Sequence, residues 1–181
     1  QAKARKSLAY FITETKADYL LGWVHREICD TLDQFLNDVK EKKSPRLIIT
    51  MPPRSGKSEI VSRRFPAYAF GQNPNLQIIA TSYSSDLSQR FNRDVQRIID
   101  DSEYAELFPQ TTLNGSRAKT DSRGSYIRTS DLFEIVGHKG SYRSCGVGGG
   151  ITGQGADILI IDDPIKDRAE ANSATVRQSI W

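Results

Sequence analysis

The sequence contains few residues from which a metal site or a disulfide could be built. Among its 181 residues there are two cysteines, two histidines and one methionine. Cys29 and Cys145 lie far apart and have no second cysteine or histidine at metal-ligand spacing, so we interpret both as reduced thiols. His25 and His138 are equally isolated in the sequence. These scarcities exclude a zinc site and a disulfide framework.

Long apolar runs are also missing. No stretch approaches the roughly 20 apolar residues that span a bilayer. The basic residues 1–6 are followed by Tyr10, Thr13 and Glu14, where a signal peptide would need an unbroken apolar core. The hydrophobic content of 38% and the charged content of 26% are those of an ordinary soluble domain. A net charge of +3 permits a nucleic-acid partner without requiring one. We therefore expect a cytoplasmic protein without a membrane partner.

The first part of the chain predicts a helix, a strand, a loop and a second helix, in that order. Apolar residues recur at helical spacing at Ile28, Leu32, Phe35, Leu36 and Val39. Residues 47–50 are a short apolar, β-branched run that is typical of a strand buried on both faces. A loop follows, and a second helix is expected to begin near Lys57. We expect that helix to kink or break at Pro66 and to stop near Gly71.

The rest of the chain continues the alternation of strands and helices. Residues 77–81 predict a second buried strand, residues 87–100 a helix, and residues 158–161 the strongest strand in the chain. Such alternation favours a parallel sheet with helices on both faces. Residues 125–129 and 132–136 are shorter and predict antiparallel strands. The expected fold is α/β, with a mostly parallel central sheet flanked by helices and with antiparallel hairpins around residues 114–146.

Residues 51–58 partly match the Walker A pattern of phosphate-binding loops. The match begins at Gly56-Lys57-Ser58, while Met51 stands where the pattern has its first glycine. A loop that leaves a strand and opens a helix aims backbone N–H groups at anionic oxygens. Gly56 allows close approach to phosphates, Lys57 would pair with the β and γ phosphates, and the Ser58 hydroxyl would bind Mg²⁺. We therefore predict an ATP and Mg²⁺ site in this loop.

Arg54 adds a second cation inside the same loop. Its position suits contact with the γ-phosphate or with the charge that develops as this group departs. The alternative is a solvated or carboxylate-paired arginine without a role in the chemistry.

The predicted strand at 158–161 ends in two adjacent acids. ATP hydrolysis needs one carboxylate that holds Mg²⁺ and another acceptor that orients the attacking water. Asp162 would contact Mg²⁺ directly or through water, and Asp163 would polarise the water. Because Asp is one methylene shorter than the Glu common at this position, Glu170 is an alternative water acceptor. The simpler interpretation is that both acids only cap the turn at Pro164.

Four segments in order carry a family resemblance. The chain resembles the N-terminal ATPase domain of tailed-bacteriophage terminase large subunits over residues 23–181, nearly its whole length. The resemblance lies in residues 51–59, 81–87, 146–153 and 160–166.

The resemblance implies a P-loop NTPase of the RecA-like, ASCE type that hydrolyses ATP to push double-stranded viral DNA into a capsid. It further implies a portal protein and a small terminase subunit as partners, a homo-oligomeric ring and a place in the host cytoplasm. Family members usually carry a C-terminal nuclease domain and a coupling motif, and we expect the chain to be truncated before both. We expect residues 1–44 to form a helical segment packed on an ATPase core of residues 45–181, and the isolated fragment to turn over weakly.

The resemblance also suggests residues for nucleotide binding. In the family, the segment ahead of the Walker A strand helps to hold the adenine, and the nearest candidates are Trp23, His25 and Arg26, unless they are ordinary packing and surface residues. The predicted nucleotide-binding residues are His25, Pro53, Arg54, Ser55, Gly56, Lys57, Ser58 and Glu59, with Asp163, Arg54 and Lys57 as catalytic residues and Ser58 and Asp162 as Mg²⁺ ligands.

The family relies further on an arginine presented to a neighbouring subunit. Because Gln154 stands where related sequences often have arginine, Arg143 or Arg128 are the alternatives. Basic residues outnumber acids in the same region and would face DNA phosphates or merely solvent; they are Arg117, Lys119, Arg123, Arg128, Lys139 and Arg143.

Two other functions share a phosphate loop. A small-molecule kinase would transfer the γ-phosphoryl group to a bound acceptor, and a non-catalytic module would bind nucleotide without turnover. The adjacent Asp162 and Asp163 favour water as the acceptor, and thus hydrolysis.

Overall fold

The computed structural model describes residues 1–113, 115, 126–151 and 153–180 of the chain. Its elements, in chain order, are α1 (Leu8–Thr15), α2 (Trp23–Lys40), the π-helix η1 (Glu59–Arg64), α3 (Phe65–Gln72), β1 (Gln77–Ser82), α4 (Ser85–Asp100), α5 (Ser102–Leu107), β2 (Leu132–Glu134), β3 (Ser141–Gly146), β4 (Ile158–Ile161), α6 (Arg168–Asn172) and α7 (Ala174–Ile180).

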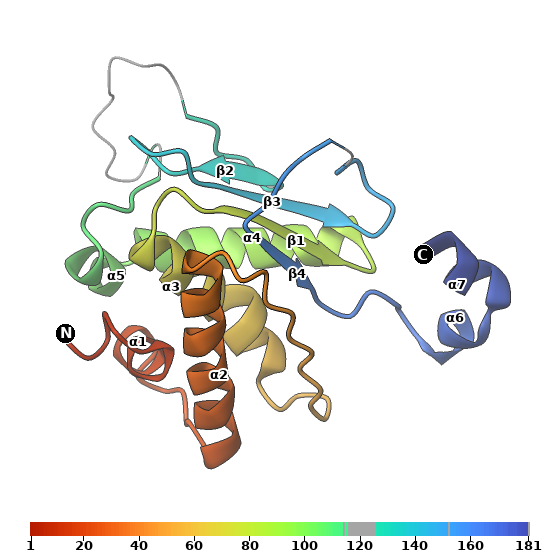
Figure 1. Ribbon diagram of the computed structural model, residues 1–181, viewed down its shortest axis with the longest axis horizontal. Coiled ribbons are helices and arrows are strands. Elements are labelled where there is room, and N and C mark those ends of the chain that lie inside the picture. Colours follow the sequence, from red (N-terminus) through yellow and green to blue (C-terminus); the bar gives the residue numbers. More distant parts are fainter. Residues whose placement is uncertain (114, 116–125, 152, 181) are drawn as a thin grey trace.

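One mixed sheet forms the centre of the fold, with the strand order β2-β3-β1-β4 (Figure 1). β1 pairs in parallel with both neighbours, so that Thr81 lies opposite Cys145 on β3 and Ile161 on β4. β2 pairs antiparallel with β3. The prediction of an α/β fold with a mostly parallel sheet is confirmed, as are the strands predicted at 77–81 and 158–161.

The predicted strand at residues 47–50 is wrong. This segment takes no strand conformation, and the Ile48 side chain is 90% exposed. A cavity of about 770 Å³ separates the segment from β4, and residues of both line it. Apolar, β-branched residues favour an extended backbone, but a strand also needs a neighbour within hydrogen-bonding distance. The sequence pattern could not show that a cavity lies between this segment and β4.

β3 was not predicted, because its sequence is short and polar. Tyr142 and Ser144 are buried, whereas Ser141, Arg143 and Cys145, which alternate with them along the strand, are partly exposed. The strand is stabilised by its place between β1 and β2, with α4 packed along it. The antiparallel strand predicted at 132–136 is confirmed as β2. The other, at 125–129, forms only an isolated bridge from Arg128 to Phe133 within its described residues.

The helix that follows the loop shows the predicted irregularity before Pro66. η1 precedes α3 directly, and the Phe65 N–H donates to the carbonyl of Ile60, five residues back. In a regular α-helix, Pro66 would leave the carbonyl four residues before it without a donor, and its ring would clash with that carbonyl. The wider π-helical turn relieves this clash. The helix ends at Gln72, one residue beyond Gly71. A Cβ at Gly71 would lie 2.4 Å from the Phe108 ring, so this glycine serves close packing.

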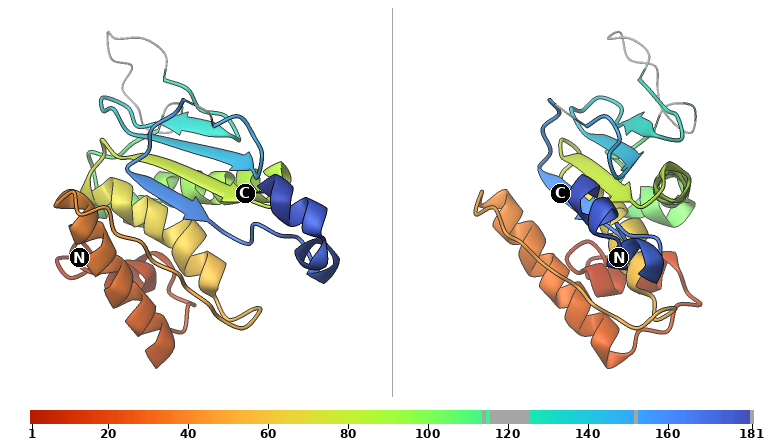
Figure 2. Two further views of the ribbon diagram at one scale, coloured as in Figure 1. Left: turned by 45° about the vertical axis from the view of Figure 1, so that its right-hand side comes forward. Right: turned by 90° about the vertical axis from the view of Figure 1, so that its right-hand side faces the viewer.

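Helices surround the sheet unevenly. α4 packs along β1 and β3. Both views of Figure 2 show α1, α2 and the η1–α3 helix on the β4 side of the sheet, with β2 at the opposite edge. α6 and α7 contact each other and extend away from the sheet beyond β4 (Figure 1). Among the helices described, none has the length and apolar character that crossing a bilayer requires.

Aromatic side chains join α1 to the helices around it. The fully buried Phe11 ring lies 5.5 Å from Tyr68, 5.9 Å from Tyr104 and 6.0 Å from Phe108, measured between centroids. These rings come from α3, from α5 and from the residue that follows α5. The N-terminal helix is therefore part of the same hydrophobic core as the rest of the molecule.

We expect Phe11→Ala to lower the free energy of unfolding by about 3–5 kcal/mol, because the vacated volume is enclosed on three sides by rings that cannot collapse into it. Urea denaturation monitored by circular dichroism measures the change. Glu14→Ala, at an exposed position of the same helix, is the control and should stay within about 0.5 kcal/mol of wild type. Equal effects of the two substitutions would show that α1 does not belong to the core.

Candidate functional site

The loop at residues 51–58 and the end of β4 meet at one lysine. The Lys57 Nζ lies 2.7 Å from Asp163 Oδ1 and 3.2 Å from Asp162 Oδ1. The register of β4 is fixed next to these acids, since the Asp162 N–H donates to the Thr81 carbonyl of β1 at 2.9 Å. The structure thus brings together three residues that the sequence assigned to the site from two distant segments.

Asp162 is buried and both of its carboxylate oxygens are engaged. It is 5% exposed, and Ser62 Oγ donates to its Oδ2 at 2.7 Å while Lys57 contacts its Oδ1. Ser62 is itself 1% exposed. Ser62 was not among the predicted site residues, although its position four residues after Ser58, about one helical turn, places it on the same helix face.

Asp163 differs from its neighbour in exposure and backbone. Its side chain is 60% exposed, and its φ of 48° lies in the left-handed region. The residue before a proline normally takes an extended backbone, so this conformation directly before Pro164 is doubly unusual. The Tyr83 N–H donates to the Asp163 carbonyl at 3.0 Å and helps to hold it. Strained backbone of this kind concentrates at functional sites.

The charges of the two acids control the protonation of Lys57. Burial by itself would lower the lysine pKa, but the hydrogen bond to Asp163 and the charge of Asp162 outweigh it and raise the pKa above its usual value. Lys57 is therefore a cation at neutral pH, ready to pair with an anion.

The loop takes a conformation that few residue types adopt easily. Arg54 has a φ of 60° and is exposed, and Gly56 has a φ of 86°. The helix opens at Lys57, and the Ile60 N–H donates to the Gly56 carbonyl at 3.1 Å. The first turn of a helix has N–H groups without helical acceptors, and these can bind an anion. The loop thus contains the exposed cation of Arg54 and leads directly into a helix start that carries the cation of Lys57.

Two residues of the N-terminal segment reach the loop. The His25 Nε2 lies 2.9 Å from the Ser55 carbonyl oxygen, and its Nδ1 accepts from the Gly22 N–H at 3.0 Å. Tyr19 packs beside Gly56. Trp23, the other aromatic residue suggested by the resemblance, is 84% exposed.

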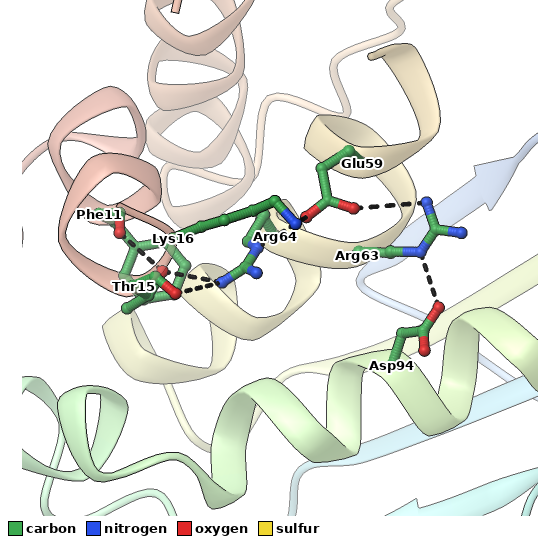
Figure 3. A network of polar contacts seen from close by, with 7 residues as sticks. All are labelled: Phe11, Thr15, Lys16, Glu59, Arg63, Arg64 and Asp94. Atoms are coloured by element: carbon green, nitrogen blue, oxygen red, sulfur yellow. Dashed lines mark hydrogen bonds and ion pairs between the residues drawn. The ribbon is translucent and has the colours of Figure 1, made fainter. Parts of the chain in front are cut away.

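Glu59 lies at the centre of a network of ion pairs (Figure 3). Its carboxylate lies 3.0 Å from Arg64 Nε, 3.5 Å from Arg63 Nη1 and 3.7 Å from Lys16 Nζ. Arg63 also pairs with Asp94 of α4 at 2.8 Å. The network ties the start of the loop helix to α1 on one side and to α4 on the other. In this structure Glu59, which the sequence analysis assigned to the nucleotide, faces three cations.

Two alternative candidates, Glu170 and Arg128, have partners other than Lys57. Glu170 is in α6, where its carboxylate accepts from the Lys166 N–H at 3.0 Å. Arg128 pairs with Asp100 and donates to Gln96 at 3.0 Å. Arg117, Lys119 and Arg123 lie outside the described residues.

A cavity adjoins the lysine and Asp162. Its volume of about 770 Å³ falls within the range of ligand pockets. Its walls come from residues 44–47 and 49, from the helices α2, η1 and α3, and from residues 156–162. Its charged lining residues are Lys42, Arg46, Lys57, Asp157 and Asp162, among mostly apolar neighbours.

Most of these residues lie in the part of the chain that matches the model of a known protein family. The family model for "Terminase large subunit, T4likevirus-type, N-terminal" matches residues 48–181. No curated protein and no solved structure matches the chain. The matched range includes Lys57 and the acids after β4, but neither Tyr19 nor His25.

We expect Ser62→Ala to lower the free energy of unfolding by about 1.5–3 kcal/mol, because a buried carboxylate oxygen of Asp162 loses its donor. Chemical denaturation of Ser62→Ala, Asp162→Asn and the double variant completes a double-mutant cycle. The two substitutions should be coupled by at least about 0.5 kcal/mol. Additive effects would contradict a direct contribution of this hydrogen bond.

Proposed function

The chain belongs to the T4likevirus-type terminase large subunits, as their N-terminal part, and its role therefore lies in viral DNA packaging; on this premise we propose that it binds and hydrolyses Mg²⁺-ATP to translocate double-stranded DNA into a capsid. The proposal rests on one observation in particular. Lys57, in the loop, is held by the two acids that follow β4, 105 and 106 residues further along the chain. A phosphate-binding lysine opposite a pair of carboxylates is the arrangement that nucleotide hydrolysis needs.

The donor atoms at this point suit Mg²⁺. Asp162 and Asp163 offer carboxylate oxygens and Ser58 a hydroxyl, and hard oxygen donors are the ligands that Mg²⁺ prefers. Within the described residues, no cluster of three or more His, Cys, Asp or Glu side chains could hold a metal. Mg²⁺ takes few protein ligands and completes its shell with water and phosphate oxygens, so two carboxylates and one hydroxyl would be sufficient to hold it. Bound here, Mg²⁺ would supply charge neutralisation to the phosphates.

Lys57 would change partners when nucleotide binds. Without nucleotide, its ammonium group neutralises the buried Asp162 and the exposed Asp163. With nucleotide, the same group would donate to β and γ phosphate oxygens, leaving Asp162 to face the metal ion. The N–H groups of the first helical turn would donate to phosphate oxygens alongside it.

Asp163 and Arg54 are suited to the chemical step. The Asp163 carboxylate is exposed and acceptor-only when ionised, so it would accept a hydrogen bond from the attacking water and orient it. The exposed guanidinium of Arg54 would donate to the γ-phosphate and stabilise the charge on the departing group. In this role Asp163, rather than Glu170, is the carboxylate already next to the phosphate-binding lysine.

The proposed partners follow from the family. As part of a terminase large subunit, the chain would act on double-stranded DNA together with a portal protein and a small terminase subunit, as one member of a homo-oligomeric ring.

We expect Asp163→Asn to lower kcat for ATP hydrolysis by about 10²–10⁴-fold, because the amide cannot accept the water proton. Lys57→Ala should abolish detectable binding of Mg²⁺-ATP. Glu170→Gln tests the alternative acceptor and should stay near wild type, as should the exposed control Lys40→Ala. Phosphate release and calorimetric titration with Mg²⁺-ATP, with and without double-stranded DNA, measure both quantities.

Two results would contradict the proposal. Unchanged Mg²⁺-ATP affinity in Lys57→Ala would mean that the loop does not bind phosphates. Transfer of the γ-phosphoryl group to a nucleoside or metabolite, rather than to water, would replace the motor with a kinase.

A further inference from the structure

The C-cap residue of α1, the linker after it and the first turn of α2 contact the loop helix and the phosphate loop at three points. Lys16 Nζ lies 3.7 Å from Glu59 Oε1, Tyr19 packs against Gly56, and His25 contacts the Ser55 carbonyl. The last two contacts are made to the loop backbone itself. The N-terminal segment is thus placed to set the loop's conformation.

The tautomer of His25 follows from its two partners. Nδ1 accepts a hydrogen bond from the Gly22 N–H, so it carries no proton. A neutral imidazole has one donor and one acceptor, and Nε2 therefore carries the proton and donates it to the Ser55 carbonyl at 2.9 Å. Both ring nitrogens are engaged by backbone groups, which fixes the ring on both sides.

The bond from His25 orients the peptide between Ser55 and Gly56. In a planar trans peptide, the C=O and N–H groups point in opposite directions. Because the Ser55 carbonyl is turned toward His25, the Gly56 N–H is turned away from it. Phosphate loops bind anions through N–H groups that converge on one point, so the orientation of this single peptide decides whether Gly56 contributes a donor.

Tyr19 restricts which residue can stand at position 56. A Cβ built on Gly56 would lie 2.3 Å from the Tyr19 hydroxyl oxygen, 3.4 Å from the ring carbon that bears it and 3.5 Å from His25 Nε2. The buried hydroxyl of Tyr19 has no hydrogen-bond partner within the described part of the chain. Burial, followed by the charge of Glu59, raises the pKa of Tyr19, so the group is a neutral phenol at pH 7. Its contact with the loop is therefore steric.

We propose that Tyr19 and His25 form a clamp that holds the phosphate loop ready for nucleotide. His25 fixes the Ser55–Gly56 peptide so that its N–H is turned away from the imidazole and is available to a phosphate oxygen. Tyr19, whose ring lies beside that of His25, blocks any side chain at position 56. The two are positioning residues and rest on the proposed nucleotide site. The clamp makes nucleotide affinity depend on the N-terminal segment, outside the range that matches the family model.

The first test concerns the hydrogen bond from His25. We expect His25→Ala to raise the Kd for Mg²⁺-ATP about 5-fold, because the net contribution of one hydrogen bond corresponds to a factor of this size. His25→Gln should recover most of this loss, because its amide can donate to Ser55 and accept from Gly22. Glu27→Ala, exposed on the same helix, is the matched control. Calorimetric titration of the whole chain gives Kd, and thermal melting without nucleotide confirms that each variant is folded.

The second test concerns the steric contact of Tyr19. Gly56→Ala should lose nucleotide affinity through both the short contact and the positive φ of residue 56. Adding Tyr19→Phe removes the 2.3 Å contact and leaves the backbone strain. The double variant should therefore bind Mg²⁺-ATP at least about 3-fold more tightly than Gly56→Ala, a recovery of roughly 0.65 kcal/mol. Tyr19→Phe alone completes the cycle.

Failure of the clamp can be told apart from failure of the nucleotide site. If Lys57→Ala abolishes binding while His25→Ala binds as tightly as wild type, or if the double variant recovers nothing, the clamp is wrong and the site stands. If Lys57→Ala binds normally, the site itself is wrong, and the clamp with it.

Discussion

The carboxylate of Asp162 is almost fully withdrawn from water, and a buried charge is costly unless it is paired and hydrogen-bonded. Lys57 and Ser62 satisfy this requirement from one helix, the first through an ion pair and the second through its hydroxyl. The first turns of the loop helix must therefore dock at the end of β4. That docking places the loop at residues 51–58 next to Asp163, and the candidate site exists because of it.

A second group of interactions holds the same helix from its other sides. Glu59 gathers Lys16, Arg63 and Arg64 around one carboxylate, and Arg63 continues the network to α4 (Figure 3). Arg64, 8% exposed, also donates to the carbonyl and hydroxyl of Thr15 in α1. Partners this closely packed lose little to solvent screening. The loop is thus carried by a helix that is fixed to α1, α4 and β4 at once.

Local sequence patterns were sufficient for much of the fold. Apolar spacing predicted α2 and α4, and apolar runs predicted β1 and β4, because periods of 3.6 and 2 residues are properties of the chain itself. The backbone chemistry of proline predicted the irregular turn before Pro66. Residue types with a restricted set of partners, a lysine after a glycine and two acids after a strand, predicted the centre of the site at Lys57, Asp162 and Asp163.

What the sequence by itself determined was therefore the type and order of most elements and the identity of the charged residues that meet at the candidate site. Only the tertiary structure decided which elements pair and which side chains meet. Residues 47–50 have no neighbouring strand to pair with, although their sequence favours one. The polar segment of β3 lies inside the sheet, between β2 and β1, and Arg128 pairs with Asp100. The tertiary structure also brought Ser62 to Asp162 and His25 to the Ser55 carbonyl. Such contacts join residues far apart in sequence, and the free energy of each depends on burial and geometry that no local pattern encodes.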